Sequence, residues 1–426
     1  MSNAMEAARR AADYVTVPLA SGLTVLVRPM PGYSSMYAMY ATRFGSVDGS
    51  FVLDGRTVTL PEGVAHFLEH KMFESEEGDA FAQYAKTGAN ANAFTGFDKT
   101  CYIFSATQKV DESLDVLLNM VGHPYFTKET IAKEQGIIGQ EIKMYDDSPD
   151  WRMLFALAQC LYHHHQIRHD IAGTVESIAK ITPEMLYDCC DAFYQPANMV
   201  LAVTGNVTVE QVLAACTRAG LDQPREAHQV ERIQTPEPEE IASPRKELYM
   251  SIAKPGVGLG YKETPLAEND LKGQVVREML CDLVIGGMTP LYRTLYDQGL
   301  VNPGFDAEAI NLPGCSCVLF TGETDEPETV CRMIRDEIER LRTEGVDEEL
   351  FIRCKNQRYG EFLCDLENIE DTASAMASDY LKGHTLFDEM ETLAGVSKAD
   401  VDEALQTMLR PERSAVVVIH PLEEEE

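Results

Sequence analysis

The amino-acid sequence predicts the α+β class: two homologous mixed α/β domains from an internal duplication, each a mostly antiparallel sheet with packed helices. Length is the first reason, because 426 residues exceed the roughly 100–200 residues of an ordinary domain. A self-match is the second, because residues 178–205 align without gaps with residues 393–420, at an offset of 215 residues. The third is a polar, proline-rich stretch at 225–245 that lacks apolar periodicity and predicts a linker.

These observations predict the following division of the chain. Residues 14–224 form the first domain, 225–245 the linker and 246–422 the second, homologous domain. Residues 1–13 are interpreted as a tag and N-terminal arm, because the opening Met1-Ser2-Asn3-Ala4 resembles a cloning scar. Residues 423–426 are an acidic tail.

In the first half, apolar spacing predicts a strand at 36–42 and then a helix. The helix is indicated by Leu114, Leu117 and Val121, with Asp111 as a candidate N-cap.

The two self-matching segments predict the same order of secondary-structure elements. A helix with an N-cap hydroxyl, from Thr182 in one half and Ser397 in the other, precedes a matching proline, Pro196 or Pro411. An apolar, β-branched run follows each proline, at 199–204 and 415–419, and predicts a buried strand. Both halves therefore combine sheet and helix.

Charge and composition exclude several classes of function. Thirty-six Lys and Arg against 69 Asp and Glu give a net charge of −33, which repels nucleic acid and anionic lipid. No apolar stretch approaches the roughly 18 residues of a membrane span. The eleven cysteines lack zinc or redox spacing and predict buried free thiols. The expected location is cytoplasmic.

Two further patterns are interpreted as structural. The run His163-His164-His165 predicts a polar surface segment, because three consecutive side chains point in different directions. The series Gly256-x-Gly258-x-Gly260 lacks the ending of a phosphate-binding loop and predicts turns.

The chemistry-bearing motif lies between Gly63 and Phe73, in the order His66-x-x-Glu69-His70. On a helix, residues four apart lie about 40° from one another and about 6 Å along the axis, so both imidazoles can face one metal ion. Neutral imidazoles suit Zn²⁺, and a neighbouring carboxylate can take a proton from the water that attacks a carbonyl. The motif therefore predicts a hydrolase site, with two solvated histidines on a surface helix as the structural alternative.

A catalytic zinc ion normally takes a third protein ligand. In the helix-like segment 130–145, Glu134, Ile138, Glu141 and Tyr145 follow helical spacing, which places two carboxylates in an apolar stripe. An unpaired buried carboxylate is costly, and a dication can offset its charge. Glu141 is the predicted ligand and Glu134 a hydrogen-bonding neighbour of the site; pairing of both with Lys or Arg is the alternative.

The run from Gly63 to Phe73 and the pair Glu134-x6-Glu141 together resemble the inverzincin metallopeptidases of the pitrilysin, insulinase and mitochondrial-processing-peptidase family. In that family two histidines and a distant glutamate bind zinc, the motif glutamate is the base, and a second glutamate assists. The resemblance implies these roles for zinc ligands His66, His70 and Glu141, base Glu69, and assisting Glu134.

The resemblance extends over most of the first half, through Phe44-Gly45-Ser46, Asn92-Ala93-Phe94-Thr95 and Ala172-Gly173-Thr174. Family members hold the substrate as an added strand beside the Asn-Ala-Phe-Thr segment, which implies that Asn92 and Ala93 contact the peptide backbone. From the residues alone, 91–95 is only a short strand candidate.

The second half departs from the family at one informative place. Many members carry an Arg and a Tyr seven residues apart, around a Gly-Leu pair, that hold the substrate carbonyl. This chain has Leu295 and Asn302 at those places. The family includes bacterial heterodimers in which a zinc-less homologous subunit supplies the pair, and this chain is similar to the zinc-bearing subunit; a homodimer is the other possibility.

The resulting expectation is a zinc-dependent endopeptidase for short or unfolded peptides, with Zn²⁺ as cofactor and a peptide as substrate. The alternative is a non-catalytic structural or peptide-binding subunit of a larger assembly.

Overall fold

The computed structural model describes residues 12–422 except residue 77, so most of the predicted N-terminal arm and the whole acidic tail lie outside the described residues. The chain divides into two compact units, and neither is continuous in sequence. Unit 1 holds the chain up to Ile142, Asp170–Gln234 and Phe362–Phe387; unit 2 holds Lys143–His169, Thr235–Glu361 and the chain from Asp388. The domain boundaries predicted from the sequence remain a prediction. The compact units are defined by contacts in the structure, whereas the predicted domains are defined by the sequence repeat.

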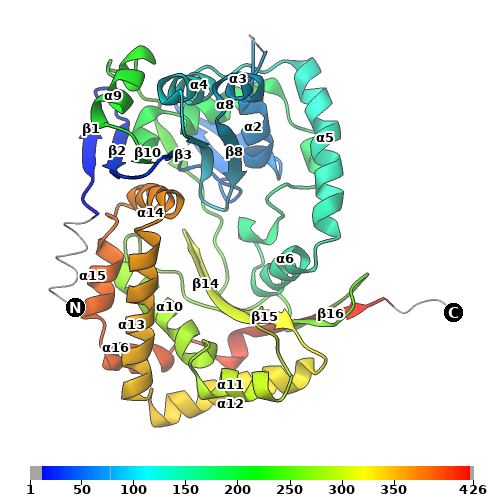
Figure 1. Cartoon of the computed structure of the whole chain (residues 1–426). Helices are drawn as coiled ribbons and strands as arrows, with labels where there is room; N and C mark the ends of the chain where they lie inside the picture. The colour runs from blue at the N-terminus through cyan, green and yellow to red at the C-terminus, as the bar shows by residue number, and fades with distance from the viewer. Residues whose placement is uncertain (1–11, 77, 423–426) are drawn as a thin grey trace. The chain divides into compact units, whose positions relative to one another are not determined.

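Unit 1 is built on a mixed sheet with the strand order β1-β2-β10-β3-β9-β8 (Figure 1). Its neighbouring strands are antiparallel except for the parallel pair β10 and β2. The strands are β1 (Val15–Pro18), β2 (Thr24–Pro29), β3 (Met36–Thr42), β8 (Asn90–Thr95), β9 (Thr100–Ala106) and β10 (Met199–Gly205). Smaller sheets join β4 (Ser50–Leu53), β5 (Arg56–Thr59) and β11 (Val230–Arg232), and β6 (Glu74–Ser75) and β7 (Gly78–Asp79).

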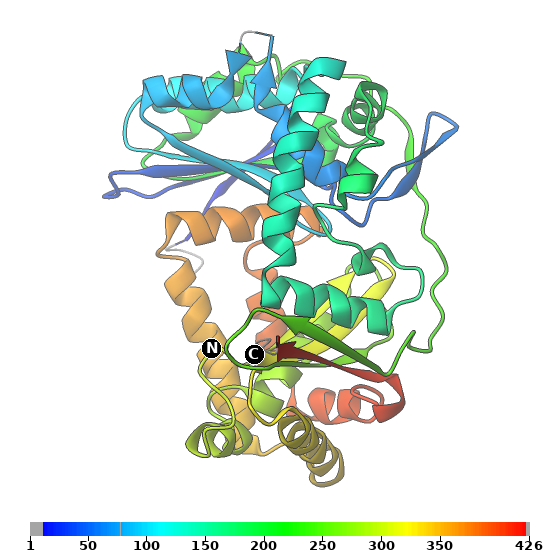
Figure 2. The ribbon, with the colours of Figure 1, turned by 90° about the vertical axis from the view of Figure 1, so that its right-hand side faces the viewer.

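Helices cover both faces of this sheet, with α14 on the face opposite to α2 and α3 (Figure 2). They are α2 (Val64–Met72), α3 (Ala80–Thr87), α4 (Val110–Gly122), α5 (Lys128–Asp146), α7 (Val175–Ile178), α8 (Pro183–Phe193), α9 (Val209–Arg218) and α14 (Ile369–Leu381). The unit boundary falls inside α5. Buried Arg28 of β2 fastens the start of α14, because its guanidinium donates to Leu366 O at 2.7 Å and to Thr372 Oγ1 at 2.9 Å.

Unit 2 contains a sheet with the order β12-β16-β13-β15-β14. Its strands are β12 (Arg245–Met250), β13 (Gly256–Lys262), β14 (Asp306–Leu312), β15 (Cys315–Glu323) and β16 (Ser414–Pro421). Its helices are α6 (Pro149–Leu161), α10 (Leu271–Ile285), α11 (Pro290–Asp297), α12 (Pro327–Glu344), α13 (Glu348–Asp365, which runs on into unit 1), α15 (Asp388–Gly395) and α16 (Lys398–Leu405).

The two sheets share one topology, which confirms the predicted fold class. The unit 2 order β12-β16-β13-β15-β14 repeats β2-β10-β3-β9-β8, and β12–β16 is parallel just as β2–β10 is. The predicted capping hydroxyls also recur, because Thr182 accepts from Met185 N and Ser397 accepts from Asp400 N. The matching prolines begin short 3₁₀ helices, η2 (Pro196–Asn198) and η3 (Pro411–Arg413), and each leads into its predicted strand.

Each repeat contributes one helix to the other repeat's unit. Helix α6 of the first repeat packs on β13 and β16, and α14 of the second repeat packs on β10 and β3. The series Gly256-x-Gly258-x-Gly260 lies in β13 under α6, so the prediction of turns was wrong. A Cβ at Gly258 would lie 2.6 Å from Met153 Sδ and 2.7 Å from Leu157 Cδ1, so these glycines let the helix approach the sheet closely.

The predicted N-cap of the helix behind Asp111 was also wrong. Helix α4 begins at Val110, two residues before the start that a cap at Asp111 implies, and its N-cap is Lys109, which has a left-handed φ of 50°. Asp111 lies in the first turn instead, where a carboxylate interacts favourably with the helix dipole.

The histidine run 163–165 acts through its backbone. The N–H groups of His163, His164 and His165 donate to the carboxylate of Glu237 at 2.7–2.9 Å, and Lys262 Nζ donates to the same carboxylate at 2.7 Å. Burial alone would raise the pKa of Glu237, but these hydrogen bonds outweigh it and lower the pKa to about 2. Glu237 thus fastens the predicted linker to unit 2.

This contact predicts a loss of stability in acid. The pKa of Glu237 lies below its ordinary 4.5, so the stabilisation is complete above pH 4.5 and disappears as the pH falls towards 2. Glu237→Gln should lower the free energy of unfolding by roughly 2–3 kcal/mol at pH 7 and flatten its decline below pH 4.5. Denaturant unfolding at pH 7, 5 and 3 measures this. Glu239→Gln is the matched control, because that side chain is 82% exposed.

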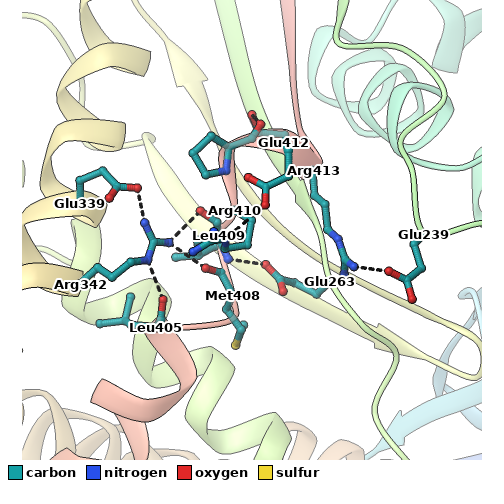
Figure 3. A network of polar contacts seen from close by, with 12 residues as sticks. Glu239, Glu263, Glu339, Arg342, Leu405, Met408, Leu409, Arg410, Glu412 and Arg413 are labelled. Carbon is teal, nitrogen blue, oxygen red and sulfur yellow. Dashed lines mark hydrogen bonds and ion pairs between the residues drawn. The ribbon is translucent and has the colours of Figure 1, made fainter.

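A polar network holds the turn before β16 (Figure 3). Arg342 Nε donates to Leu405 O at 2.8 Å, and its Nη2 donates to Met408 O at 2.9 Å. Leu409 adopts a φ of 54°, and its N–H donates to Glu263 Oε1 at 2.8 Å. Burial raises the pKa of Glu263 to about 7 although this hydrogen bond and nearby arginines oppose the shift. The network therefore fixes the start of β16, an interior strand of the unit 2 sheet.

The cysteines and the hydropathy of the helices agree with two sequence-based expectations. All eleven cysteines are free thiols, and all are buried except Cys364. Across residues 12–422, residue 77 apart, no helix combines the length and the apolar character that crossing a membrane requires.

Candidate metal and catalytic site

Helix α2 carries the His-x-x-Glu-His motif at a position fixed by glycine. Its N-cap Gly63 has a φ of 88°, and a Cβ there would lie 2.5 Å from Ala172 O. Any larger residue would clash, so the Ala172-Gly173-Thr174 segment sets where the helix begins. His66 and Glu69 are each only 7% exposed, so the motif lies largely inside unit 1.

Helix α5 brings the two downstream carboxylates to the same place, as its predicted stripe requires. Glu134 is 6% exposed and shares the buried face with Ile138, while Glu141 is half-buried. Both glutamates lie beside imidazoles of the motif, Glu134 beside His70 and Glu141 beside His66 and His70.

The imidazoles and one carboxylate converge. His66 Nε2 lies 3.6 Å from Glu141 Oε1, and His70 Nε2 lies 3.4 Å from Glu141 Oε2. One ligand atom from each of the three residues lies within 4.8 Å of the others. Bonds of about 2.0–2.2 Å in a tetrahedral zinc site separate neighbouring ligand atoms by about 3.4 Å, so the spacing fits such an ion.

Glu134 orients the imidazole ring of His70 through a hydrogen bond. Its Oε1 lies 3.0 Å from His70 Nδ1, so a proton on Nδ1 is held there and the lone pair of Nε2 faces Glu141. Burial alone would lower the pKa of His70, but the hydrogen bond to Glu134 and the charges of Glu69 and Glu141 outweigh it and raise the pKa. The surroundings of His70 therefore attract positive charge, either as a second proton on the ring or as a cation at Nε2.

The donor set also fits a dication electrostatically. Three carboxylates, Glu69, Glu134 and Glu141, surround two imidazoles, which leaves the site negative when the histidines are neutral. His66 Nδ1 is buried and has no hydrogen-bond partner among the described residues. No hydrogen bond at Nδ1 therefore constrains the orientation of the His66 ring. A cation at Nε2 would offset the charge that burial makes costly.

Glu69 lies beside these groups without belonging to the convergent set. Its Oε2 accepts a hydrogen bond from Thr95 Oγ1 at 2.7 Å. Burial raises the pKa of Glu69, and the nearby histidines and Thr95 only partly oppose the shift. A carboxylate with a raised pKa in a buried site suits a general base. The contact with Thr95 was not predicted, because nothing in the spacing links that residue to Glu69.

Asn92 and Ala93 lie on β8, an edge strand of the unit 1 sheet within the described chain. Asn92 is exposed and Ala93 half-buried, and Ala93 N donates to Asn92 Oδ1 at 2.9 Å. Strand β8 packs against α2 and ends at Thr95. An edge of this kind can accept a further strand.

Leu295 and Asn302 stand at the places where the resemblance leads one to expect an Arg and a Tyr, and both make contacts within unit 2. Leu295 is fully buried on α11. Asn302 Nδ2 donates to Glu323 Oε2 at 2.8 Å, and its Oδ1 accepts from Gly304 N at 2.9 Å. Leu295 has no polar side-chain atom to offer a carbonyl, and Asn302 already uses both ends of its amide.

Comparison with known proteins identifies the family of the chain. Residues 60–175 match the family described as insulinase (peptidase family M16), and residues 180–358 match the peptidase M16 inactive domain. The chain is 35% identical over 413 residues to the uncharacterized zinc protease YmfH of Bacillus subtilis, and the match covers 95% of each chain. The chain therefore belongs to peptidase family M16, the insulinase and pitrilysin family, as its motifs implied.

Two further relatives extend the comparison. An uncharacterized zinc protease of Rickettsia felis is 24% identical over 400 residues, which are 91% of this chain and 92% of that protein. The crystal structure of an M16-like peptidase from Alicyclobacillus acidocaldarius superimposes with a TM-score of 0.92 at 34% identity, covering 96% of this chain and 99% of that one. Both the fold class and the family are thus confirmed over nearly the whole chain.

Proposed function

We propose that this chain is a zinc-dependent endopeptidase that hydrolyses peptide bonds in short or unfolded peptides. The convergence of His66 Nε2, His70 Nε2 and the Glu141 carboxylate, with contacts of 3.4 and 3.6 Å, carries the proposal. The relatives named zinc proteases support it.

His66, His70 and Glu141 would hold the zinc ion, and Glu134 would keep the ring of His70 in place. When bound, the ion acidifies water and polarises the scissile carbonyl. Glu69 accepts the proton of the attacking water and passes it to the leaving amine. Asn92 and Ala93 on the edge strand β8 pair with the peptide backbone and align the scissile bond with the site.

The binding mode favours extended substrates. A peptide can add to a sheet edge only where its own N–H and C=O groups are free, as they are in short or unfolded chains. Folded proteins are therefore expected to be poor substrates.

The function is tested by metal analysis of protein purified without chelators, together with cleavage of an unstructured peptide followed by mass spectrometry. Approximately one zinc ion per chain and internal cleavage sites are expected. A chain that binds zinc but cleaves no peptide, with or without a partner, would instead be a non-catalytic subunit.

We further propose that a homologous subunit without zinc ligands completes the enzyme as a heterodimer. Leu295 is buried and has no polar side-chain atom, and Asn302 Nδ2 already donates to Glu323, so neither residue offers the charged and phenolic donors of an Arg and Tyr pair. Loss of one such donor typically lowers kcat by about 10²–10³-fold.

The partner proposal predicts a weak enzyme when the chain is alone. Addition of a zinc-less family subunit that carries the Arg and Tyr should raise kcat at least about 100-fold. Light scattering together with peptide hydrolysis, on the chain alone and on the mixture, measures this. A stable homodimer that already cleaves at the rate of the mixture would contradict the heterodimer.

A further inference from the structure

A hydrogen bond connects the end of β8 with the motif helix. Thr95 Oγ1 donates to Glu69 Oε2 at 2.7 Å across 26 positions of sequence. Glu69 is only 7% exposed, so bulk water does little to orient its carboxylate. The hydroxyl engages one oxygen and thereby limits rotation of the carboxylate about its terminal torsion, which is otherwise broad.

Among the described residues, Thr95 is the hydrogen-bond partner of the Glu69 side chain. The imidazoles of His66 and His70 and the carboxylate of Glu141 also lie near it, but only the hydroxyl of Thr95 specifies a hydrogen-bonding direction.

The turn after Thr95 is itself held firmly. Gly96 N donates to Lys99 O at 2.8 Å and closes the turn between β8 and β9. The loop after β3 is hydrogen-bonded to this turn, because Ser46 N donates to Gly96 O at 3.1 Å and Val47 N donates to Phe97 O at 3.0 Å. The end of β8 is therefore fixed from outside its own strand pair.

The close approach of the loop after β3 to the β8–β9 turn depends on Gly45. A Cβ at Gly45 would lie 2.3 Å from Phe97 O, closer than any side chain tolerates, so the loop reaches the turn only with glycine there. Thr100 Oγ1 adds a hydrogen bond to Phe44 O at 2.8 Å. The segment Phe44-Gly45-Ser46 thus supports the strand end from which Thr95 projects.

We propose that Thr95 is a positioning residue that holds the Glu69 carboxylate in its working orientation. The contacts of residues 44–47 with the β8–β9 turn support Thr95 in its position. This inference rests on the proposed function of Glu69 as the base. Misplacement of a reacting group by about 1 Å can lower a rate by about 100-fold, so a restraint of this kind has a measurable effect.

Thr95→Val is the direct test, because valine keeps the β-branched shape and removes the hydroxyl. We expect kcat to fall about 10- to 100-fold while KM stays within about twofold and zinc content is unchanged. Thr95→Ser should restore kcat to within about threefold of the wild type, because it returns the donor. An unchanged kcat in Thr95→Val, a change in KM alone, or a serine variant as slow as the valine variant would each overturn the proposal.

Thr87→Val is the matched control. The Thr87 hydroxyl is also buried, but it donates to Tyr84 O at 3.0 Å and accepts from Ala89 N at 3.3 Å, so it contacts backbone groups at the end of α3 and not the Glu69 carboxylate. Its loss should leave kcat per folded molecule unchanged. If Thr87→Val slows the enzyme as much as Thr95→Val, the effect is one of general destabilisation and the proposal fails.

A crystallographic comparison separates this inference from the proposed function. In Thr95→Val the Glu69 carboxylate should rotate or occupy more than one orientation, and in Thr95→Ser it should match the wild type. This readout needs no turnover, so a wild-type chain that cleaves nothing, with or without a partner, refutes the proposed function and still leaves the positioning inference decidable. An unaltered, single orientation of Glu69 in Thr95→Val refutes the inference.

Discussion

Glu69→Gln is expected to retain zinc and to lower kcat by about 10²–10⁴-fold. Glutamine preserves the size of the side chain and can still accept the hydrogen bond from Thr95 Oγ1, so the local packing survives. Its amide cannot accept a proton at neutral pH, and the attacking water therefore loses its base. The loss should appear in kcat rather than in KM, because the base acts in the transition state.

The measurement is steady-state cleavage of a fluorogenic peptide, with zinc content determined on the same preparation. Glu210→Gln, on the exposed face of α9, makes the same chemical change away from the site and should cleave as fast as the wild type. Normal cleavage by Glu69→Gln would show that another group is the base.

Glu141→Gln is expected to cost at least about 100-fold in zinc affinity. Loss of a residue that only supports a ligand typically costs about 10–100-fold, and Glu141 is proposed to be a ligand itself. Its carboxylate lies 3.4–3.6 Å from both imidazole Nε2 atoms and supplies the charge that a dication requires. Activity should be lost with the metal.

Competition with a chromophoric chelator measures the affinity, and thermal unfolding gives a readout independent of activity. Zinc at 1,000 times its dissociation constant stabilises the folded chain by about 4 kcal/mol, and the variant should lose most of that gain. Glu129→Gln, exposed on the same helix, is the control, and Glu134→Gln should show an intermediate loss. If Glu141→Gln binds zinc as tightly as the wild type, Glu141 is not a zinc ligand.

The convergent part of the site was predictable because it depends on local periodicity. Four-residue spacing places His66 and His70 on one side of α2, and seven-residue spacing places Glu134 and Glu141 on one side of α5. Carboxylates in an apolar stripe need a partner that offsets their charge, and beside two imidazoles a metal ion is the partner that this chemistry favours.

The contacts that depend on tertiary structure were not predictable. Nothing in the sequence joins Thr95 to Glu69, because a strand end and a helix meet only after the sheet has formed. The glycines of β13 resemble turn residues until α6 is known to cover them. The apolar stripe of α6 predicts that the helix packs on something, but it does not say on which sheet.

The reciprocal placement of α6 and α14 has a consequence for the history of the chain. Each sheet was shaped against a helix encoded by the other repeat, so after duplication neither copy was free to diverge alone. A bulkier residue on β13 requires a slimmer one on α6, and the same holds for β10 and α14. The packing of these two helices therefore couples the choice of side chains at positions that lie far apart in the sequence.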